Sequence, residues 1–191
     1  MGVMRASRGR TLRVGLLLLA SGGCVSSAHA ADVPFFIGGL YAYGNSTNVY
    51  GVQAVWAPRE GNEFLAPHDL GFRVAAQVQR WVASDGDSPY HSLADGSVIA
   101  ELRYWLAPEA PVRPFAEGGL GVHLLSNVRV GNRQLGVAFD FGSQVAVGAV
   151  FGDNGRYELA AFAHHVSNAG IKDPNDGINY FGIRFRAAVL P

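Results

Sequence analysis

The protein has 191 residues, and its 15 Lys and Arg residues balance 15 Asp and Glu residues, so the whole chain is formally neutral. This length suits a single domain. The charges form no basic stripe of the kind that binds nucleic acid, so no nucleic-acid partner is expected.

The first 30 residues are laid out like a secretory signal peptide. Four arginines come first, the apolar run of residues 14–20 follows, and small residues lead to Ala28-His29-Ala30. This A-x-A site predicts that residues 1–30 are removed and that residues 31–191 form the mature protein. Cys24, the only cysteine, is expected to leave with the leader. Lipidation of Cys24 is the lesser alternative, because no large apolar residue stands three positions before it.

The mature chain has a different charge from the whole. Without the leader arginines it has 11 basic residues against 15 acidic ones, a net charge of −4, and it has no cysteine for a disulfide. No later segment approaches the roughly 18 apolar residues that a membrane-spanning helix needs. A helical membrane protein is therefore excluded.

The mature chain reads as alternating strands and turns. Period-two patterns separated by Gly, Pro, Asn and Asp clusters predict eight strands. The predicted strands cover residues 35–43, 49–57, 70–82, 97–106, 113–125, 139–151, 156–167 and 178–189. Several approach the 9 to 11 residues with which a tilted strand crosses a bilayer.

The two faces of these strands differ sharply. One face is apolar, as with Leu120, Val122 and Leu124 in the fifth strand, and the other carries charge, as with Glu117. The charged faces together hold both signs, which a narrow lumen filled by salt-bridged side chains requires. The pattern predicts an all-β fold, an eight-stranded antiparallel outer-membrane β-barrel over residues 31–191. A soluble, lipocalin-like cup with the apolar face inside is the competing interpretation.

The seventh strand places a histidine and a serine side by side. Residues i and i+2 of a strand share a face, so His165 and Ser167 lie together on the apolar face. A base beside a hydroxyl is a possible nucleophile pair, although two polar residues at a membrane interface would need no catalytic role. His164, on the lumen face, is expected to be a satisfied interior histidine. The remaining histidines show no metal-ligand spacing, so no metal site is predicted.

The residues around this pair resemble a known family. The run from His165 to Lys172, HVSNAGIK, followed by Pro174-Asn175-Asp176-Gly177, is similar to the signature of PagL, the outer-membrane lipid A 3-O-deacylases. Weaker collinear support comes from residues 114–122 and 131–136. The resemblance spans most of the second half of the chain, and the first half matches mainly in strand layout.

The resemblance implies a cofactor-free esterase that removes the 3-linked acyl chain of lipid A, the lipid anchor of lipopolysaccharide, in the outer membrane of a Gram-negative bacterium. By the same resemblance, Ser167 would be the nucleophile and His165 the general base. Asn168 and the backbone N–H of Gly170 would stabilise the oxyanion. The resemblance gives no oligomeric state.

Two features depart from the family pattern. The triad acid of the family is a glutamate, and the matching position here is Asn179, which can orient an imidazole but cannot offset the charge of an imidazolium. Asp176 could substitute if its loop folds back. The chain also ends on Val189-Leu190-Pro191 rather than on an aromatic residue.

Two further functions stay open on the sequence alone. The chain could be a non-catalytic structural or adhesive barrel, including a family member that lost activity with its triad acid. It could instead be a soluble lipid-binding protein, if the cup interpretation holds.

Overall fold

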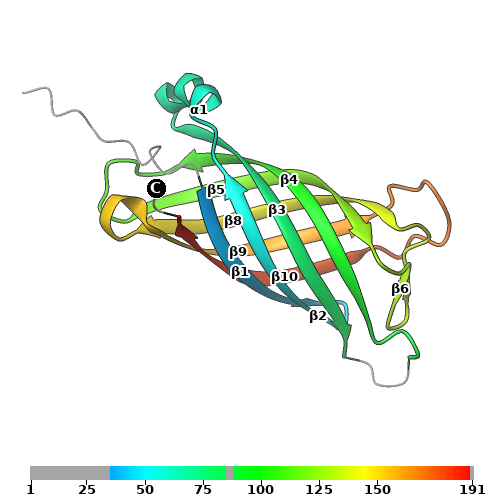
Figure 1. Ribbon diagram of the computed structural model, residues 1–191. Helices are drawn as coiled ribbons and strands as arrows, with labels where there is room; N and C mark the ends of the chain where they lie inside the picture. The colour runs from blue at the N-terminus through cyan, green and yellow to red at the C-terminus, as the bar shows by residue number, and fades with distance from the viewer. Residues whose placement is uncertain (1–34, 85–87, 190–191) are drawn as a thin grey trace, which may run out of the picture.

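Eight long strands close into one antiparallel barrel in the computed structural model, which describes residues 35–84 and 88–189 (Figure 1). Around the barrel the order is β1-β10-β9-β8-β5-β4-β3-β2. The strands are β1 Phe35–Gly44, β2 Thr47–Trp56, β3 Leu70–Ala83, β4 Ser92–Trp105, β5 Arg113–Leu125, β8 Phe139–Phe151, β9 Tyr157–Ser167 and β10 Ile178–Ala188. The barrel predicted from the sequence is confirmed. The predicted signal peptide lies outside the described residues.

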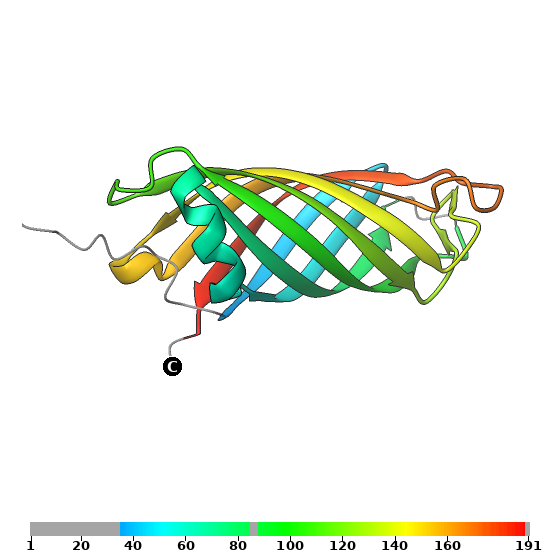
Figure 2. The ribbon, with the colours of Figure 1, turned by 90° about the horizontal axis from the view of Figure 1, so that it is seen from above.

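Short elements connect the strands. Helix α1 (Arg59–Leu65) and the 3-10 turn η2 (Ala66–His68) join β2 to β3, and Figure 2 shows α1 lying across one end of the barrel. The hairpin β6 (Arg129–Val130) and β7 (Arg133–Gln134) joins β5 to β8, and η3 (Asp153–Gly155) joins β8 to β9. The sequence did not predict these short helices and strands, because each is too short to show a hydrophobic periodicity. Within the described ranges, no helix has the length and apolar content to cross a membrane.

Strand β4 begins five residues earlier than predicted. The pair Asp95-Gly96 has the composition of a turn, yet in the barrel it continues the strand opposite Leu124 and Leu125 of β5. The Asp95 side chain points inward, where its Oδ2 lies 2.8 Å from His123 Nδ1. A buried partner thus overrides the local turn preference.

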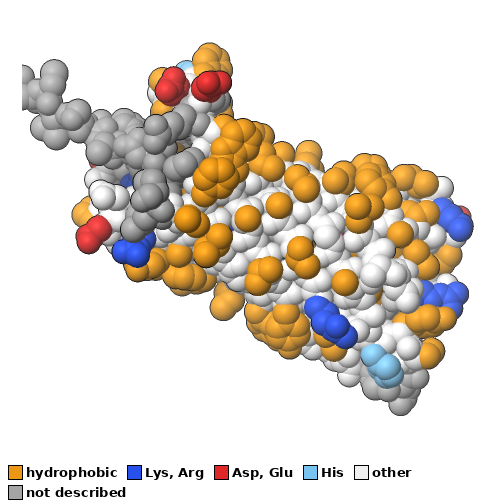
Figure 3. Space-filling view, in the orientation of Figure 1, with side chains coloured by type: hydrophobic (Ala, Val, Ile, Leu, Met, Phe, Trp, Pro, Cys, Tyr) orange, Lys and Arg blue, Asp and Glu red, His pale blue; other side chains and the backbone are white. Residues whose placement is uncertain are grey.

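Apolar side chains cover the outside of the barrel. Leu120 is 71% exposed and Phe181 67% exposed, and Figure 3 shows hydrophobic side chains spread over the visible wall between the two ends. A soluble cup would bury this face, so the lipocalin-like alternative is wrong. The arrangement matches barrels whose outer surface meets lipid tails.

We expect replacement of Leu120 by alanine to lower the free energy of unfolding by about 2 kcal/mol. The change removes about three methylene equivalents from an apolar surrounding at about 0.8 kcal/mol each. Reversible unfolding of the protein in lipid vesicles measures this. Glu60→Ala on the exposed side of α1 is the control and should change little. A Leu120→Ala change within about 0.5 kcal/mol, as for an ordinary water-facing site, would contradict the lipid-facing assignment.

Paired charges fill the middle of the barrel. Arg186 Nη2 lies 2.6 Å from Glu101 Oε1, and Arg103 Nη2 lies 2.7 Å from Glu117 Oε2. The whole group, called the central ion cluster below, comprises Arg73, Arg103, Arg184, Arg186, Glu101, Glu117 and Glu158. All seven are buried. The predicted salt-bridge core is confirmed, and its mutual pairing offsets the cost of removing these charges from water.

The two ends of the barrel carry different structures. Strand β1 starts and β10 finishes at the end that holds α1, so both described chain ends lie there (Figure 1). The opposite end carries the tight turn Asn45-Ser46, the β6–β7 hairpin and the loop of residues 168–177. The His-Ser pair belongs to this second end, because β9 finishes at Ser167.

Candidate active site

Alternation along β9 places the predicted pair on the outside of the barrel. His165 is exposed and Ser167 half-buried, whereas their neighbours His164 and Val166 are buried in the interior. The face predicted for His165 and Ser167 is therefore confirmed. His164 is the interior histidine that was expected: its Nε2 lies 3.2 Å from His123 Nε2, and its ring stacks on Tyr180 at a centroid distance of 5.0 Å.

Three side chains form a hydrogen-bonded line on this outer face. His165 Nε2 lies 3.0 Å from Ser167 Oγ, and His165 Nδ1 lies 2.8 Å from Asn179 Oδ1. The amide oxygen can only accept, so it selects the tautomer with hydrogen on Nδ1. This leaves Nε2 with a free lone pair, directed at the serine hydroxyl. The serine is thereby positioned to lose its proton to the imidazole as it attacks.

Strand register brings Asn179 to the histidine. His165 and Asn179 are directly paired between β9 and β10, so their side chains stand next to each other on the same face. Sequence reasoning matched Asn179 to the triad-acid position of the family, and in the structure Asn179 lies beside His165. Asp176 does not take this place, because its Oδ2 accepts the backbone N–H of Gln134 at 2.7 Å.

Asn45 is a residue that sequence reasoning missed. Its Oδ1 accepts the backbone N–H of Asn179 at 2.6 Å, which ties β10 to the turn between β1 and β2. Asn45 and Ser46 both have positive φ, 46° and 56°, as the two central residues of a type I′ hairpin turn require. Asn tolerates that conformation, so the residue serves both the turn and the site.

Asn168 holds the loop beyond the serine. It is buried, and its Nδ2 donates to the carbonyl oxygens of Leu135 at 2.8 Å and Lys172 at 2.7 Å. Its Oδ1 accepts the backbone N–H of Gly170 at 2.9 Å. Both groups predicted to stabilise an oxyanion therefore hydrogen-bond within the protein in this structure: the Asn168 amide to the backbone of Leu135, Lys172 and Gly170, and the Gly170 N–H to that amide.

Gly136, just after β7, lets the loop of residues 168–177 pack closely against the β7–β8 connection. Gly136 has a φ of +80°, and a Cβ there would approach Pro174 O to 2.4 Å and Asn168 Nδ2 to 2.9 Å. Asn175 adds a further contact, since its Oδ1 accepts the backbone N–H of Asn168 at 3.1 Å. The loop carrying the signature residues is therefore locked against the β7–β8 connection.

The described part of the chain has no group of three or more His, Cys, Asp or Glu residues arranged to hold a metal ion. His68 lies in η2 and His91 precedes β4.

A family model described as lipid A 3-O-deacylase (PagL) matches residues 48–188. A curated lipid A deacylase PagL of Pseudomonas aeruginosa is 31% identical over 180 residues, covering 94% of this chain and 99% of the relative. A lipid A deacylase PagL of Bordetella bronchiseptica is 32% identical over 99 residues, covering 52% of each chain.

Solved structures show the same fold. A crystal structure of the outer membrane enzyme PagL superposes with a TM-score of 0.66 at 23% identity, covering 81% of this chain and 99% of that one. The family match spans all the barrel strands except β1, and it includes His165, Ser167 and Asn179. The chain belongs to the PagL family.

Proposed function

We propose that this protein is a lipid A 3-O-deacylase of the bacterial outer membrane, a serine esterase that works on the outer wall of its barrel. The observation that carries the proposal is the hydrogen-bonded line Ser167–His165–Asn179 on a wall covered mainly by apolar side chains. The relatives named as lipid A deacylases support the choice of substrate.

The proposed mechanism has two halves. Ser167 Oγ attacks the carbonyl carbon of the 3-linked ester while His165 Nε2 takes its proton. The tetrahedral intermediate collapses, the bond between the carbonyl carbon and the ester oxygen breaks, and His165 returns the proton to that oxygen, which leaves on the sugar as its hydroxyl. Water then attacks the acyl-serine with His165 again as base, releasing the fatty acid and restoring the serine hydroxyl. This route needs no cofactor.

The position of the site agrees with a substrate in the outer leaflet. With an even number of strands both chain ends lie at the same end of the barrel, and in outer-membrane barrels that end faces the periplasm. The pair lies at the end opposite the described chain ends. Orientation by this rule places Ser167 near the outer surface, where the ester bonds of lipid A lie.

A polar cavity of about 440 Å³ lies beside the site and supports binding of a sugar headgroup. It is formed by three of the connections at this end of the barrel, β1–β2, β6–β7 and β9–β10, and Asn45 links it to the Asn179 backbone. Its lining residues are Asn45, Ser46, Thr47, Val130, Gly131, Asn132, Arg133 and Asp176. A headgroup held there would leave its acyl chains against the apolar wall.

Mass spectrometry of lipid A tests the proposal. The refolded mature protein should remove one 3-hydroxyacyl chain from purified lipid A in mixed micelles. An unchanged lipid A mass after prolonged incubation with folded protein would reject the deacylase assignment and favour a structural barrel.

We expect Asn168→Ala to lower kcat about tenfold. The change frees two carbonyl groups and the Gly170 N–H at once, so the loop next to Ser167 loses its fixed position. Small misplacements of reacting groups are enough to slow an enzyme strongly. Initial rates of acyl release measure the effect, and Asn127→Ala in the β5–β6 connection is the matched control. Equal rates for Asn168→Ala and the native protein would show that the loop does not position the serine.

A further inference from the structure

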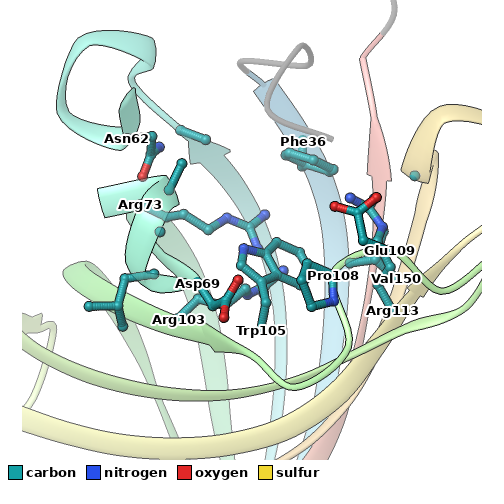
Figure 4. A pocket seen from close by; sticks show the side chains of 15 residues that line it. Phe36, Asn62, Asp69, Arg73, Arg103, Trp105, Pro108, Glu109, Arg113 and Val150 are labelled. Atoms are coloured by element: carbon teal, nitrogen blue, oxygen red, sulfur yellow. The ribbon is translucent and has the colours of Figure 1, made fainter. Parts of the chain in front are cut away.

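One charged side chain faces outward from the wall of the barrel. Alternation along β3 directs Arg80 to the outside, where it is exposed. The eight barrel strands all lie within the described ranges, and Arg80 is the only Lys, Arg, Asp or Glu at their outward-facing positions. The other arginines of these strands point inward, and Figure 4 shows Arg73 and Arg103 inside the barrel at the end that holds α1. On the wall seen in Figure 3, Lys or Arg surface interrupts the hydrophobic side chains toward the opposite end.

The register of the strands defines equal depth around the barrel. From Ser167, the direct pairs lead through the other seven strands and return to β9 at Tyr157, ten residues nearer the α1 end. One circuit of the barrel therefore shifts the register by ten residues, and half a circuit shifts it by five. An eight-stranded barrel with this shift has strands tilted by about 40°, as outer-membrane barrels have.

Arg80 lies at nearly the depth of the proposed nucleophile, on the opposite side of the barrel. Direct pairs lead from Arg80 over β2, β1 and β10 to Ala161 of β9, four strands away. Ala161 is six residues before Ser167, one more than the five that equal depth requires. On a strand tilted by about 40°, one residue changes the depth by about 2.5 Å. Arg80 is thus half a circuit from Ser167 and only slightly nearer the α1 end.

The neighbours of Arg80 are typical of a membrane interface. Tyr50 is its direct partner on β2 and is 50% exposed, and the centroids of the Tyr50 and Tyr41 rings lie 5.2 Å apart. Belts of exposed aromatic residues lie at the headgroup level of membrane proteins. A charged side chain that faces lipid is unfavourable at the bilayer midplane and much less so near the interface. The register and the tyrosines therefore both place Arg80 at the level of the lipid headgroups.

The guanidinium of Arg80 keeps most of its donors free. Its Nη2 donates to Ser92 Oγ at 2.8 Å, which holds the side chain against β4. Among the residues that the structure describes, Nε and Nη1 have no hydrogen-bond partner, and no Asp or Glu forms an ion pair with Arg80. Asp85 and Asp87, in the connection after β3, lie outside the described residues. The planar fork of an exposed guanidinium matches the oxygens of a phosphate group.

We propose that Arg80 binds the phosphate group of a lipid in the leaflet that Ser167 faces, at a second lipid site half a circuit from the catalytic residues. Because of the strand tilt, the acyl chains below the phosphate cross β2, where Val52 is 65% exposed. This lipid is not a substrate, since Ser167 lies on the other side of the barrel. The site uses the same membrane orientation as the proposed function but none of its chemistry.

Fluorescence quenching by brominated lipids tests the site. The mature chain predicted from the sequence has no cysteine, so Val78→Cys places a single fluorophore on β3, two residues from Arg80. The refolded protein is placed in vesicles of phosphatidylcholine and phosphatidic acid, in which one lipid or the other is brominated. Phosphatidic acid carries its phosphate as a monoester and should be preferred beside the label by about fivefold. Equal quenching by the two lipids overturns the site.

Three further proteins locate the preference. Arg80→Gln, labelled at position 78, should lose it, and an unchanged preference in the folded variant overturns the assignment to Arg80. Arg129→Gln is the matched control, because Arg129 is an exposed arginine at the same end of the barrel and is bonded to Tyr90. It should keep the preference. A label at Val145→Cys, on the outward face of β8, should report no preference, and an equal preference there would overturn a site at Arg80.

Two more measurements examine other partners for the guanidinium. Replacing Asp85 and Asp87 together by asparagine should leave the lipid preference unchanged. A clear rise in this variant would show that these acids already occupy Arg80, which overturns the free fork. Inorganic phosphate in the buffer should not alter the quenching. Displacement of the brominated lipid by inorganic phosphate would overturn the assignment to a lipid.

Deacylation is measured separately, on lipid A, so that the two proposals can fail independently. Arg80→Gln should deacylate lipid A at the native rate while losing the preference for phosphatidic acid. Heat-modifiable migration on gels verifies that each variant is folded. A native protein that shows the preference but leaves lipid A unchanged would reject the proposed function and support this inference. A native protein that deacylates lipid A without the preference would do the reverse.

Discussion

Replacement of Ser167 by alanine is expected to lower kcat for lipid A deacylation by at least about 10³-fold. The reason is that the hydroxyl 3.0 Å from His165 Nε2 is the group that forms the acyl-enzyme bond in the proposed mechanism. Removing the nucleophile of such a line forces water to attack unaided, and losses of this order or larger follow. Mass spectrometry of lipid A after timed incubation measures the rate.

The control for this experiment is another serine on the outer wall. Ser143 is exposed and directly paired with His165 in the β8–β9 register, but the imidazole bonds to Ser167 and Asn179 instead. Ser143→Ala should therefore keep most of the activity. If Ser167→Ala deacylates lipid A at the native rate while folded, the proposed nucleophile is wrong.

Replacement of Asn179 by aspartate is expected to raise kcat by about 10- to 100-fold. The two side chains have the same shape, so the 2.8 Å contact with His165 Nδ1 is preserved. A carboxylate there stabilises the imidazolium that forms in the transition state, and a hydrogen bond to a charged group contributes about 1.5 to 3 kcal/mol. Each 1.36 kcal/mol is a factor of ten in rate. Glutamate, the residue that the family pattern has here, should also raise the rate once its longer chain has adjusted.

The matched comparison is Asn179→Leu, which fills similar space but offers no acceptor. It should lower kcat, because the imidazole is then free to adopt the wrong tautomer or orientation. A native rate in both Asn179→Asp and Asn179→Leu would mean that the residue plays no part in catalysis. A rate increase in the aspartate variant would show that the native protein works with a weakened triad.

Much of the fold follows from alternation along the strands. Arg103 and Glu117 were placed in the lumen, and Leu120 outside it, simply from parity, because a strand has only two faces and one-residue errors in its ends do not change them. The start of β4 could not be predicted in this way. Asp95 is kept in the strand by His123, a residue 28 positions later, and such pairing depends on the closed barrel.

For the candidate site, too, the features that depend on local sequence were predicted and those that depend on distant contacts were not. His165, Ser167 and Asn179 were found because the first two share a strand and the third matches a family position. The engagement of Asn168 and the contribution of Asn45 were missed, since both depend on contacts between separate loops.

The bond between Asn45 and Asn179 joins residues 134 positions apart, and it crosses the seam between β1 and β10 where the sheet closes on itself. The hairpin of β9 and β10 can bring His165, Ser167 and Asn179 together locally, but the backbone beneath Asn179 is fixed only once the first strand has arrived. Enzymatic activity should therefore appear with ring closure during insertion, later than the hairpin itself. Catalytic activity thus requires the closed barrel. A chain that remains an open sheet in the membrane should not deacylate the surrounding lipid.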